Sequence, residues 1–542
     1  MTLNKLALVI LIFIYPGYSY TNYNNTMNDF IGANIDMSLY LDHYWEDGSQ
    51  DPDYEVAAPF RWVRIYHRWD WFEEPFDDNY TFNTVNWKDM DDFHTKLDQD
   101  SVNILIAVEL GVSWLGVSGN TPYDNGDGSS ENHYRQRAEY LAQLAARYGY
   151  TVHSNSNYLE TPDKVSGLGI VKYFEDFNEE DQWWSTPAWH PYDYGKYLNA
   201  VHDGQGVTTD SSLPLAGIKQ GDPAAVHVMG GMAKNGLEST PAYSGSYLQA
   251  AVDSAGRNAF DIINFHQYWH DGSRGVSPEY GILEANPERI NDLIAWRDAN
   301  APGCRIWLTE FGWDTYDSSG THSHQWAPEL QQANYLMRAF ALLKHAGIDK
   351  AFMFMLEDFN SSGTTQYDSC GVMSDSYQHK ISYYYLSTMR HSLGQYVFTR
   401  ALQHAQGSPQ RFLYEFSKPG DQNQKAYMLW CRQSGSKFDN NTTVNNYNLS
   451  LSNITNCQLI TCQDNNLTGV KSNLTITDPG LATASVTVPL VSETPVFLQT
   501  VTEYIYTGPL VSFNKGPSAN TTTNSPFVIK LTVDKEYGYW ST

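Results

Sequence analysis

Cysteine and basic residues are both scarce in this chain of 542 residues. Five cysteines are too few for a disulfide scaffold, and none stands at a spacing typical of metal ligands. Lysine and arginine number 34 against 61 aspartates and glutamates, which gives a net charge of −27. Nucleic acids and anionic membranes attract basic surfaces, so this balance argues against both as partners. A neutral or weakly charged ligand is easier to accommodate.

Long apolar runs are almost absent as well. The run near the start, Leu6 to Ile14, is too short to span a bilayer. Lys5 precedes this run and the segment Gly17-Tyr18-Ser19 follows it, which is the pattern of a secretory signal peptide over residues 1–19. We therefore expect a secreted, extracellular protein.

Two further patterns fit export. Ten Asn-x-Ser/Thr sequons are present, seven of them after residue 400, so a eukaryotic secretory host would make this chain a glycoprotein. Cys457 and Cys462 are close in sequence and are candidates for a disulfide across a hairpin. Because the cysteine count is odd, at least one thiol stays free or pairs between chains.

The composition changes near residue 400. Residues 401–542 hold 9 basic and 9 acidic side chains, and only Trp430 and Trp540 of the 16 tryptophans lie there. Alternating runs such as ATASVTVPL and PFVIKLTV predict strands. We expect an all-β sandwich domain over 396–542. It lacks a dense aromatic face, so we favour a structural role for it over a ligand-binding one.

Upstream of this tail, strand-like and helix-like segments alternate. Eight strands alternating with helices predict a (β/α)8 (TIM) barrel, which we place at 20–395. A doubly wound open sheet has the same alternation, but it usually carries a Gly-rich phosphate loop, and none is visible. The predicted strands are 30–37, 60–69, 102–110, 169–177, 225–232, 261–269, 305–313 and 350–356. The clearest helical patterns are 134–149, 286–299 and 329–347, the last ending at a glycine typical of a C-cap.

Two carboxylate motifs end strands of this pattern. Glu179 follows the fourth predicted strand in the stretch FEDFNEED, and Glu310 ends the apolar run of the seventh in WLTEFGW. In a TIM barrel the carboxyl ends of the strands form one face, where residues from several strands converge. Two carboxylates on one face can act as acid and nucleophile in glycoside hydrolysis with retention.

These motifs carry a family resemblance. The chain from roughly 28 to 395 resembles clan A of the retaining (β/α)8 glycoside hydrolases, in Asn178-Glu179, His266-Gln267-Tyr268 and Thr309-Glu310-Phe311-Gly312. The resemblance implies that Glu179 is the general acid/base and that Glu310 is the nucleophile. It also implies that Asn178 holds the sugar 2-hydroxyl.

Three further residues match positions of the clan. Arg64, in RWVRIYHRW, matches an arginine near the nucleophile, and His266 and Tyr268 match a pair that orients nucleophile and sugar. A guanidinium beside Glu310 would lower the pKa of that carboxyl group and keep it ionised. A tyrosine hydroxyl can donate to a carboxylate and fix its orientation.

Two departures from the clan pattern are visible. Glu180 replaces the proline that commonly follows Asn-Glu, which changes the loop and not the catalytic atoms. The eighth strand lacks the tryptophan that often lies under the sugar and instead ends in Glu357-Asp358. We expect Asp358 to contact sugar hydroxyl groups in its place.

Other side chains near the strand ends are candidates for the cleft lining. His67 follows the second strand, and Trp183, Trp184 and Trp313 lie in loops after strands four and seven. Sugar faces stack on aromatic rings, so some of these tryptophans are expected to bind substrate. Ordinary packing is the alternative for each of them.

The sequence as a whole predicts a secreted hydrolase of O-glycosidic bonds, a retaining β-glycosidase that degrades a polysaccharide or oligosaccharide. Loops with tryptophans favour endo action, with exo action as the alternative. We expect a monomer without metal or cofactor. A catalytically silent carbohydrate-binding protein on the same scaffold is the rival from another class. A metal hydrolase would need a cluster of ligands that His67 and His266 alone do not make.

Overall fold

The computed structural model describes residues 25–35, 58–73, 87–115, 127–182, 184, 188–317, 320–502, 532–533 and 540–541. The chain divides into two compact units, Met1–Glu503 and Tyr504–Thr542. The described part of the second unit is an antiparallel pair, β18 (Thr532–Val533) and β19 (Trp540–Ser541). The predicted signal peptide lies outside the described residues. Within the described ranges, no helix combines the length and apolar character needed to cross a membrane.

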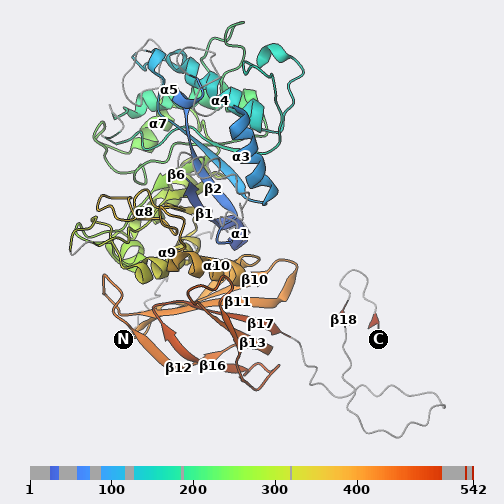
Figure 1. Ribbon diagram of the computed structural model, residues 1–542, viewed down its shortest axis with the longest axis vertical. Coiled ribbons are helices and arrows are strands. Elements are labelled where there is room, and N and C mark those ends of the chain that lie inside the picture. The colour runs from blue at the N-terminus through green and yellow to red at the C-terminus, as the bar shows by residue number, and fades with distance from the viewer. Residues whose placement is uncertain are drawn as a thin grey trace, which may run out of the picture. The chain divides into compact units, whose positions relative to one another are not determined.

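Eight parallel strands close into a barrel in the first unit, and this confirms the predicted fold class (Figure 1). The ring closes where Ile31 of β1 pairs with Ala351 of β8. Each strand lies within its predicted run, because strands buried on both faces form continuous apolar segments in the sequence. The strands are β1 (Ile31–Ile35), β2 (Trp62–Arg68), β3 (Asn103–Glu109), β4 (Tyr173–Glu175), β5 (Val226–Val228), β6 (Ile262–His266), β7 (Arg305–Glu310) and β8 (Lys350–Met353).

Helices connect the barrel strands (Figure 1). The three predicted helices are present as α4, α8 and α9, and α9 ends where Gly347 takes a left-handed φ of 99°. The helices are α1 (Met27–Phe30), α3 (Trp87–Gln99), α4 (Arg135–Tyr148), α5 (Pro191–Asp203), α6 (Ile218–Gly221), α7 (Tyr247–Ala255), α8 (Glu288–Asn300), α9 (Glu329–Ala346) and α10 (Ile381–Leu393). Short helical turns lie at Trp69–Trp71, Ser113–Leu115, Glu131–Tyr134, Ser156–Tyr158 and Tyr280–Ala285.

The inside of the barrel changes from apolar to polar along the strands. Six buried side chains form an apolar cluster: Trp62, Leu105, Val228, Ile262, Trp307 and Phe352. Because strand side chains alternate between faces, the residues two positions further along also point inward. On β2, β6 and β7 these residues are Arg64, Asn264 and Thr309, all fully buried. The apolar cluster therefore supports a polar layer on which the candidate site is built.

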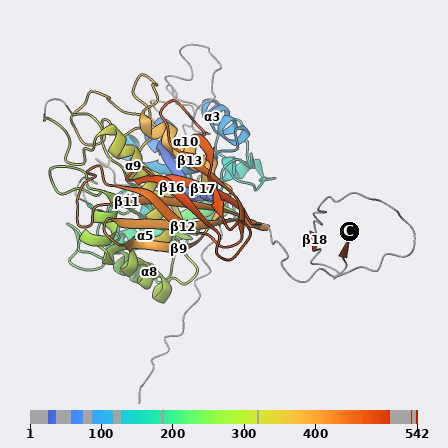
Figure 2. The same ribbon diagram turned by 90° about the horizontal axis from the view of Figure 1, so that it is seen from below.

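Antiparallel sheets follow the barrel, in agreement with the predicted β-sandwich. The six-stranded sheet has the order β14-β13-β17-β11-β10-β9 and the three-stranded sheet β12-β16-β15. Viewed from below, β12 and β16 lie in front of the larger sheet (Figure 2). The strands are β9 (Val397–Gln406), β10 (Gln410–Lys418), β11 (Asp421–Arg432), β12 (Thr443–Ser450), β13 (Ile454–Thr461), β14 (Val470–Asn473), β15 (Ile476–Thr477), β16 (Ser485–Ser492) and β17 (Val496–Thr502).

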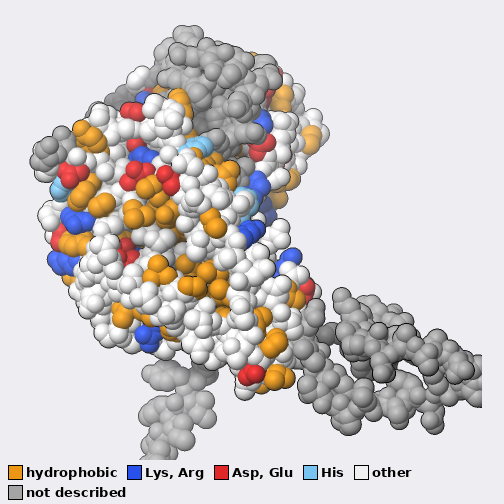
Figure 3. Space-filling model, turned by 60° about the horizontal axis from the view of Figure 1, so that its bottom comes forward, with side chains coloured by type: hydrophobic (Ala, Val, Ile, Leu, Met, Phe, Trp, Pro, Cys, Tyr) orange, Lys and Arg blue, Asp and Glu red, His pale blue; other side chains and the backbone are white. Residues whose placement is uncertain are grey.

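Both faces of the six-stranded sheet are buried, each in a different core. Phe412 and Trp430 belong to the core that also holds the barrel helices. Their strand neighbours Leu413 and Leu429 belong to a second core shared with the small sheet. The face seen in Figure 3 is mostly white, the colour of the backbone and of side chains that are neither hydrophobic nor charged.

A buried ion-pair network also joins barrel and sheets. Arg338 of α9 contacts Asp439 at 2.7 Å and Glu279 at 3.2 Å, and all three side chains are almost inaccessible. The indole nitrogen of Trp430 donates to the same Glu279 carboxylate at 2.7 Å. Burying these charges is tolerable only because they are paired.

All five cysteines are thiols in this structure, so the expected disulfide between Cys457 and Cys462 is absent. Both residues belong to one chain segment, with Cys457 inside β13 and Cys462 just after its end. A strand rises about 3.3 Å per residue, so five residues place them on the order of 16 Å apart. A disulfide requires Cα atoms within about 7 Å.

Candidate active site

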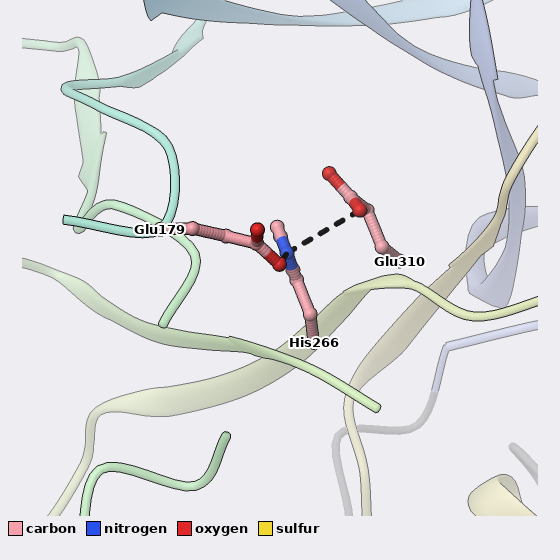
Figure 4. Close-up of side chains that lie close together, drawn as sticks. All are labelled: Glu179, His266 and Glu310. Atoms are coloured by element: carbon pink, nitrogen blue, oxygen red, sulfur yellow. Dashed lines mark hydrogen bonds and ion pairs between the residues drawn. The ribbon is translucent and has the colours of Figure 1, made fainter. Parts of the chain in front are cut away.

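The two candidate carboxylates converge at the carboxyl end of the barrel. Glu310 is the last residue of β7, and Glu179 lies in the loop after β4. Figure 4 shows their side chains pointing toward each other with His266 beside them, and one polar atom from each residue lies within 4.8 Å of the others. The sequence motifs thus meet in space.

Glu179 has an unusual backbone conformation. Its φ is 53°, in the left-handed region, where a side chain costs about 1–2 kcal/mol. Its N–H donates to the carbonyl of Gly231 at 3.0 Å, and Asn178 forms a parallel bridge with the same glycine. Strained residues of this kind cluster at functional sites.

Glu310 is almost fully buried and accepts several hydrogen bonds. Arg64 donates to its Oε1 at 2.8 Å, and the hydroxyl of Tyr66 donates to the same oxygen. Tyr268 donates to Oε2 at 3.0 Å, and Nδ1 of His266 lies 3.4 Å from that oxygen. Both oxygens are therefore held by donors.

These neighbours decide the charge of Glu310. Burial alone would raise the pKa of this carboxyl group. The charges of His266 and Arg64, with the hydroxyl donors Tyr66 and Tyr268, outweigh burial and hold the pKa below its ordinary value. Glu310 is thus kept ionised although its side chain is almost fully buried.

Arg64 connects the parts of the site. Its guanidinium forms two 2.7 Å hydrogen bonds with Glu175 and reaches Glu310 at 2.8 Å. A further hydrogen bond, at 2.8 Å, goes to the side-chain oxygen of Asn178. That contact leaves the amide nitrogen of Asn178 without a partner among the described residues, so this nitrogen remains able to donate.

Glu179 has different surroundings from Glu310. The indole nitrogen of Trp184 donates to its Oε2 at 2.6 Å, and Nδ1 of His266 lies 2.8 Å from Oε1. Its side chain is 15% exposed, against 7% for Glu310. Because Trp184 itself is 45% exposed, this side of the site is open to solvent.

His266 is fully buried between the two carboxylates. Its ring packs against Gly231, where a Cβ atom would lie only 2.1 Å from Nε2, so only glycine fits there. Burial favours the neutral imidazole, but the carboxylates of Glu310 and Glu179 outweigh burial and raise the pKa of His266. The ring therefore keeps its second proton to a higher pH than an ordinary histidine does.

Aromatic rings form one wall of the site. Tyr367 packs on Tyr268 at 5.1 Å and on Phe354 at 5.3 Å between ring centroids, and Phe354 also meets Tyr66 at 6.2 Å. Tyr367 has a left-handed φ of 77°, and its N–H donates to Asp314 at 3.2 Å. Phe354 directly follows β8, the strand whose end lacks a tryptophan.

His67 does not line the cleft, which corrects the sequence prediction. It is fully buried, stacks on Phe72 at 4.1 Å between ring centroids, and meets the hydroxyl of Tyr140 on α4 at 3.2 Å. Burial lowers the pKa of His67, so the ring is neutral. Alternation along β2 explains the placement: Arg64 and Tyr66 point into the barrel and His67 points outward.

Of the three candidate tryptophans, Trp184 alone is shown at the site. Trp313 is fully buried, stacks on Trp269 at 5.7 Å, and donates to the carbonyl of Val276 at 3.0 Å. It is a packing residue and not a sugar platform, which corrects that prediction. Trp183 lies outside the described residues.

Asp358 is also used for packing and not for sugar contact. Its carboxylate pairs with Lys380 at 2.7 Å and accepts from the N–H of Gly371 at 2.7 Å and from the hydroxyl of Ser361 at 2.8 Å. The side chain is completely buried. These contacts fix the loop after β8, so the predicted contact of Asp358 with sugar hydroxyl groups is wrong.

Sequence reasoning did not single out Tyr66 and Tyr367 as site residues. Tyr66 could have been found from alternation, because it lies two residues after Arg64 on the same strand. Tyr367 lies in a loop of irregular structure, and no local pattern marks it. Glu175 is a further residue of the site, and its partner is Arg64 on β2.

Glu179, His266 and Glu310 are close enough to be considered as metal ligands. The donor set argues against this, because both oxygens of Glu310 already accept hydrogen bonds and Arg64 adds a positive charge. A dication would have to displace Arg64 or approach it closely. The residues therefore fit a proton-transfer site better than a metal centre.

Comparison of the sequence with protein-family models and with curated proteins gives no match. Among solved structures, a family 39 glycoside hydrolase from Bacteroides cellulosilyticus is similar, with a TM-score of 0.57, 15% identity, and coverage of 89% of this chain and 82% of that chain. A glucosidase from Croceicoccus marinus has a TM-score of 0.56, 11% identity, and coverage of 89% and 97%. A family 51 α-L-arabinofuranosidase from Bifidobacterium longum has a TM-score of 0.53, 14% identity, and coverage of 88% and 96%. At these identities the similarity concerns the fold.

Proposed function

We propose that the protein is a retaining glycoside hydrolase, with Glu310 as the nucleophile and Glu179 as the general acid/base. The observation that carries the proposal is the short separation of the two carboxylates, which have oxygens within 4.8 Å of each other. Retaining enzymes hold these groups roughly 5–5.5 Å apart, and inverting enzymes roughly 6.5–9.5 Å apart to admit a water. The separation therefore supports direct attack by a carboxylate.

Glu310 is suited to attack the anomeric carbon. The charge of Arg64 and two tyrosine hydroxyl groups keep it ionised and fix its orientation. Attack forms a glycosyl-enzyme ester and releases the leaving group, which takes a proton from Glu179. In the second step Glu179 accepts a proton from water, the water attacks the anomeric carbon, and Glu310 is released.

The surrounding side chains support sugar binding. The amide nitrogen of Asn178 is placed to hold the 2-hydroxyl while its oxygen is fixed by Arg64. Phe354 and Tyr367 provide a wall for the sugar in place of a tryptophan. Trp184 contacts the acid/base and exposes its indole, so it suits the side of the leaving group.

We propose a secreted glycoprotein enzyme that acts on β-linked polysaccharides or oligosaccharides as a monomer. The acidic chain favours neutral sugars over anionic partners. The similar structures include a glucosidase and an α-L-arabinofuranosidase, so glucosides and α-L-arabinofuranosides belong in a substrate panel. Endo action now has less support, because Trp313 is buried, and product lengths from a polysaccharide would separate endo from exo cleavage.

Proton NMR of the fresh product tests the mechanism directly. A panel of aryl glycosides and polysaccharides identifies a substrate, and the first-formed anomer is then read before mutarotation. We expect the anomeric configuration of the substrate to be retained. An inverted anomer would contradict Glu310 as nucleophile. Binding of sugars without any turnover across the panel would favour the silent binding protein instead.

Two variants then separate the roles of the carboxylates. Glu310→Gln should stop glycosyl-enzyme formation with every substrate. Glu179→Gln should lower the rate of hydrolysis most for substrates with poor leaving groups, because activated aryl glycosides need little protonation. Azide should rescue Glu179→Gln alone, since azide attacks the glycosyl-enzyme without a base. Equal losses in both variants on an activated substrate, with no azide effect in either, would mean that the two roles are misassigned.

A further inference from the structure

A buried chain of hydrogen bonds lies behind His266. Nε2 of His266 lies 3.0 Å from the hydroxyl oxygen of Thr309, and that hydroxyl donates to Oδ1 of Asn264 at 2.8 Å. All three side chains are fully buried. This series of hydrogen bonds starts at Asn264 in the polar layer of the barrel and leads through Thr309 and His266 to Glu179.

The direction of these hydrogen bonds fixes one proton of the imidazole. The amide oxygen of Asn264 can only accept, so the hydroxyl hydrogen of Thr309 points toward it. The oxygen of Thr309 then offers a lone pair to His266. Nε2 must therefore carry a hydrogen in both the neutral and the charged ring.

The other ring nitrogen faces Glu179. Nδ1 lies 2.8 Å from Oε1, and a contact of this length requires one proton between the two atoms. On the other oxygen, the indole of Trp184 can only donate. The shared proton is therefore located between Nδ1 of His266 and Oε1 of Glu179.

We propose that Thr309 and Asn264 are positioning residues that hold His266 in its Nε2–H form, so that His266 and Glu179 share the proton that the general acid delivers. This inference rests on the proposed function. In the first step the Nδ1–H bond breaks, the O–H bond of Glu179 forms, and that proton passes to the glycosidic oxygen as the glycosidic bond breaks. In the second step the water oxygen bonds to the anomeric carbon as the bond from that carbon to Glu310 breaks, and the water gives a proton to Glu179, from which the proton returns to Nδ1.

The charged groups around the pair favour holding this proton. Glu310 lies 3.4 Å from Nδ1, and the carboxylates of Glu175 and Asp181 also act on the ring, against the single guanidinium of Arg64. The net effect is the raised pKa of His266 described above. The surrounding charges therefore stabilise the proton that His266 and Glu179 share.

Thr309→Val tests the chain, with Thr309→Ser as the matched control that keeps the hydroxyl. The measurement is kcat/KM against pH on an aryl glycoside with a poor leaving group. The alkaline limb of this profile reports loss of the proton that the general acid delivers. A hydrogen bond is stronger to a charged than to a neutral donor, so Thr309→Val should lower the alkaline limb by about 0.5–1 pH unit. Thr309→Ser should keep the wild-type limb. An unmoved limb in Thr309→Val, or an equal shift in both variants, would overturn the proposal.

Nitrogen NMR of the wild-type protein gives a second test that needs neither a folded variant of Thr309 nor activity. The His266 signals are assigned by their loss in His266→Gln. We expect Nε2 to be protonated at every pH where the protein is folded, while Nδ1 gains its proton as pH falls. A neutral ring with its hydrogen on Nδ1 would overturn this inference while leaving the retaining mechanism intact. Inversion at the anomeric carbon would overturn the mechanism without changing the NMR result.

Discussion

Removal of one hydroxyl group, in Tyr66→Phe, should shift the pH dependence of the enzyme. This hydroxyl accepts from Nη1 of Arg64 at 2.6 Å and donates to Oε1 of Glu310. Without it, Arg64 at 2.8 Å is the remaining hydrogen-bond donor to Oε1 among the residues that the structure describes. The phenyl ring keeps its packing against Phe354, so the change is confined to the hydrogen bonds.

The size of the shift follows from the hydrogen bond that is lost. A hydrogen bond to a charged group contributes about 1.5–3 kcal/mol, and about 1.4 kcal/mol corresponds to one pKa unit. The pKa of Glu310 is depressed in the folded protein, so the reactive carboxylate is present above that pKa and is lost as pH falls through it. Tyr66→Phe should raise this pKa and move the acid limb of kcat/KM upward by about 1–2 pH units.

The assay is kcat/KM against pH on an activated aryl glycoside, which needs little help from the acid. Tyr268→Phe is the matched control, because it removes a hydroxyl that donates to the other oxygen of Glu310 at 3.0 Å. We expect its acid limb to move in the same direction by a smaller amount. An acid limb of Tyr66→Phe at the wild-type position would refute the assigned role of this tyrosine.

Three further outcomes are expected. Tyr268→Phe should lower kcat on the order of 10- to 100-fold if its hydroxyl only orients Glu310, and steady-state kinetics measures this. Burial and the charge of nearby carboxylates raise the pKa of Glu180 in the folded protein. The folded state therefore binds the proton more tightly than the unfolded state does. This stabilisation is complete below about pH 4 and is lost as pH rises through the raised pKa. Glu180→Gln should therefore raise the melting temperature more at pH 8 than at pH 4.5, and an equal change at both would contradict the raised pKa. Arg338→Met removes the positive charge that Glu279 and Asp439 share and should reduce the free energy of unfolding by roughly 3–5 kcal/mol, measured by denaturant titration.

The barrel was predictable because its strands are buried on both faces. Runs such as VNILIAVEL and RIWLTEFGW are short, apolar and bounded by polar segments, and each contains one strand, β3 and β7. The helix α5, PYDYGKYLNAVHD, was harder to recognise. Its buried positions include Tyr194 and Tyr197, whose rings pack in the core while their hydroxyl groups bond to Asp176. Tyrosine in an apolar role weakens the helical hydrophobic pattern.

The site was predictable where its residues end strands and unpredictable where loops fold back. Glu310 and His266 are the last residues of β7 and β6, and both lie at the strand ends where the apolar runs place them. His266 also follows the alternation from Asn264, whereas Glu310 directly follows the inward-facing Thr309, and the pairing of β6 with β7 shifts its register at this point. Trp313 is only three residues beyond Glu310, yet its loop turns it into the core. Asp358 is paired with Lys380, 22 residues further along the chain, and no local pattern reveals such a partner. His67 is different, since alternation from Arg64 already predicts that it points outward.

Two adjacent glycines explain how neighbouring glutamates acquire opposite environments. A Cβ atom on Gly230 would lie 2.6 Å from a carboxylate oxygen of Glu180, and one on Gly231 would lie 2.1 Å from the ring of His266. Glu180 can therefore pack against the end of β5, fully buried, with neither oxygen hydrogen-bonded among the described residues. Glu179, with its left-handed backbone tied to the carbonyl of Gly231, turns the other way and meets His266. A side chain at Gly230 would displace the hidden Glu180, and one at Gly231 would displace His266, the partner of Glu179 in the site.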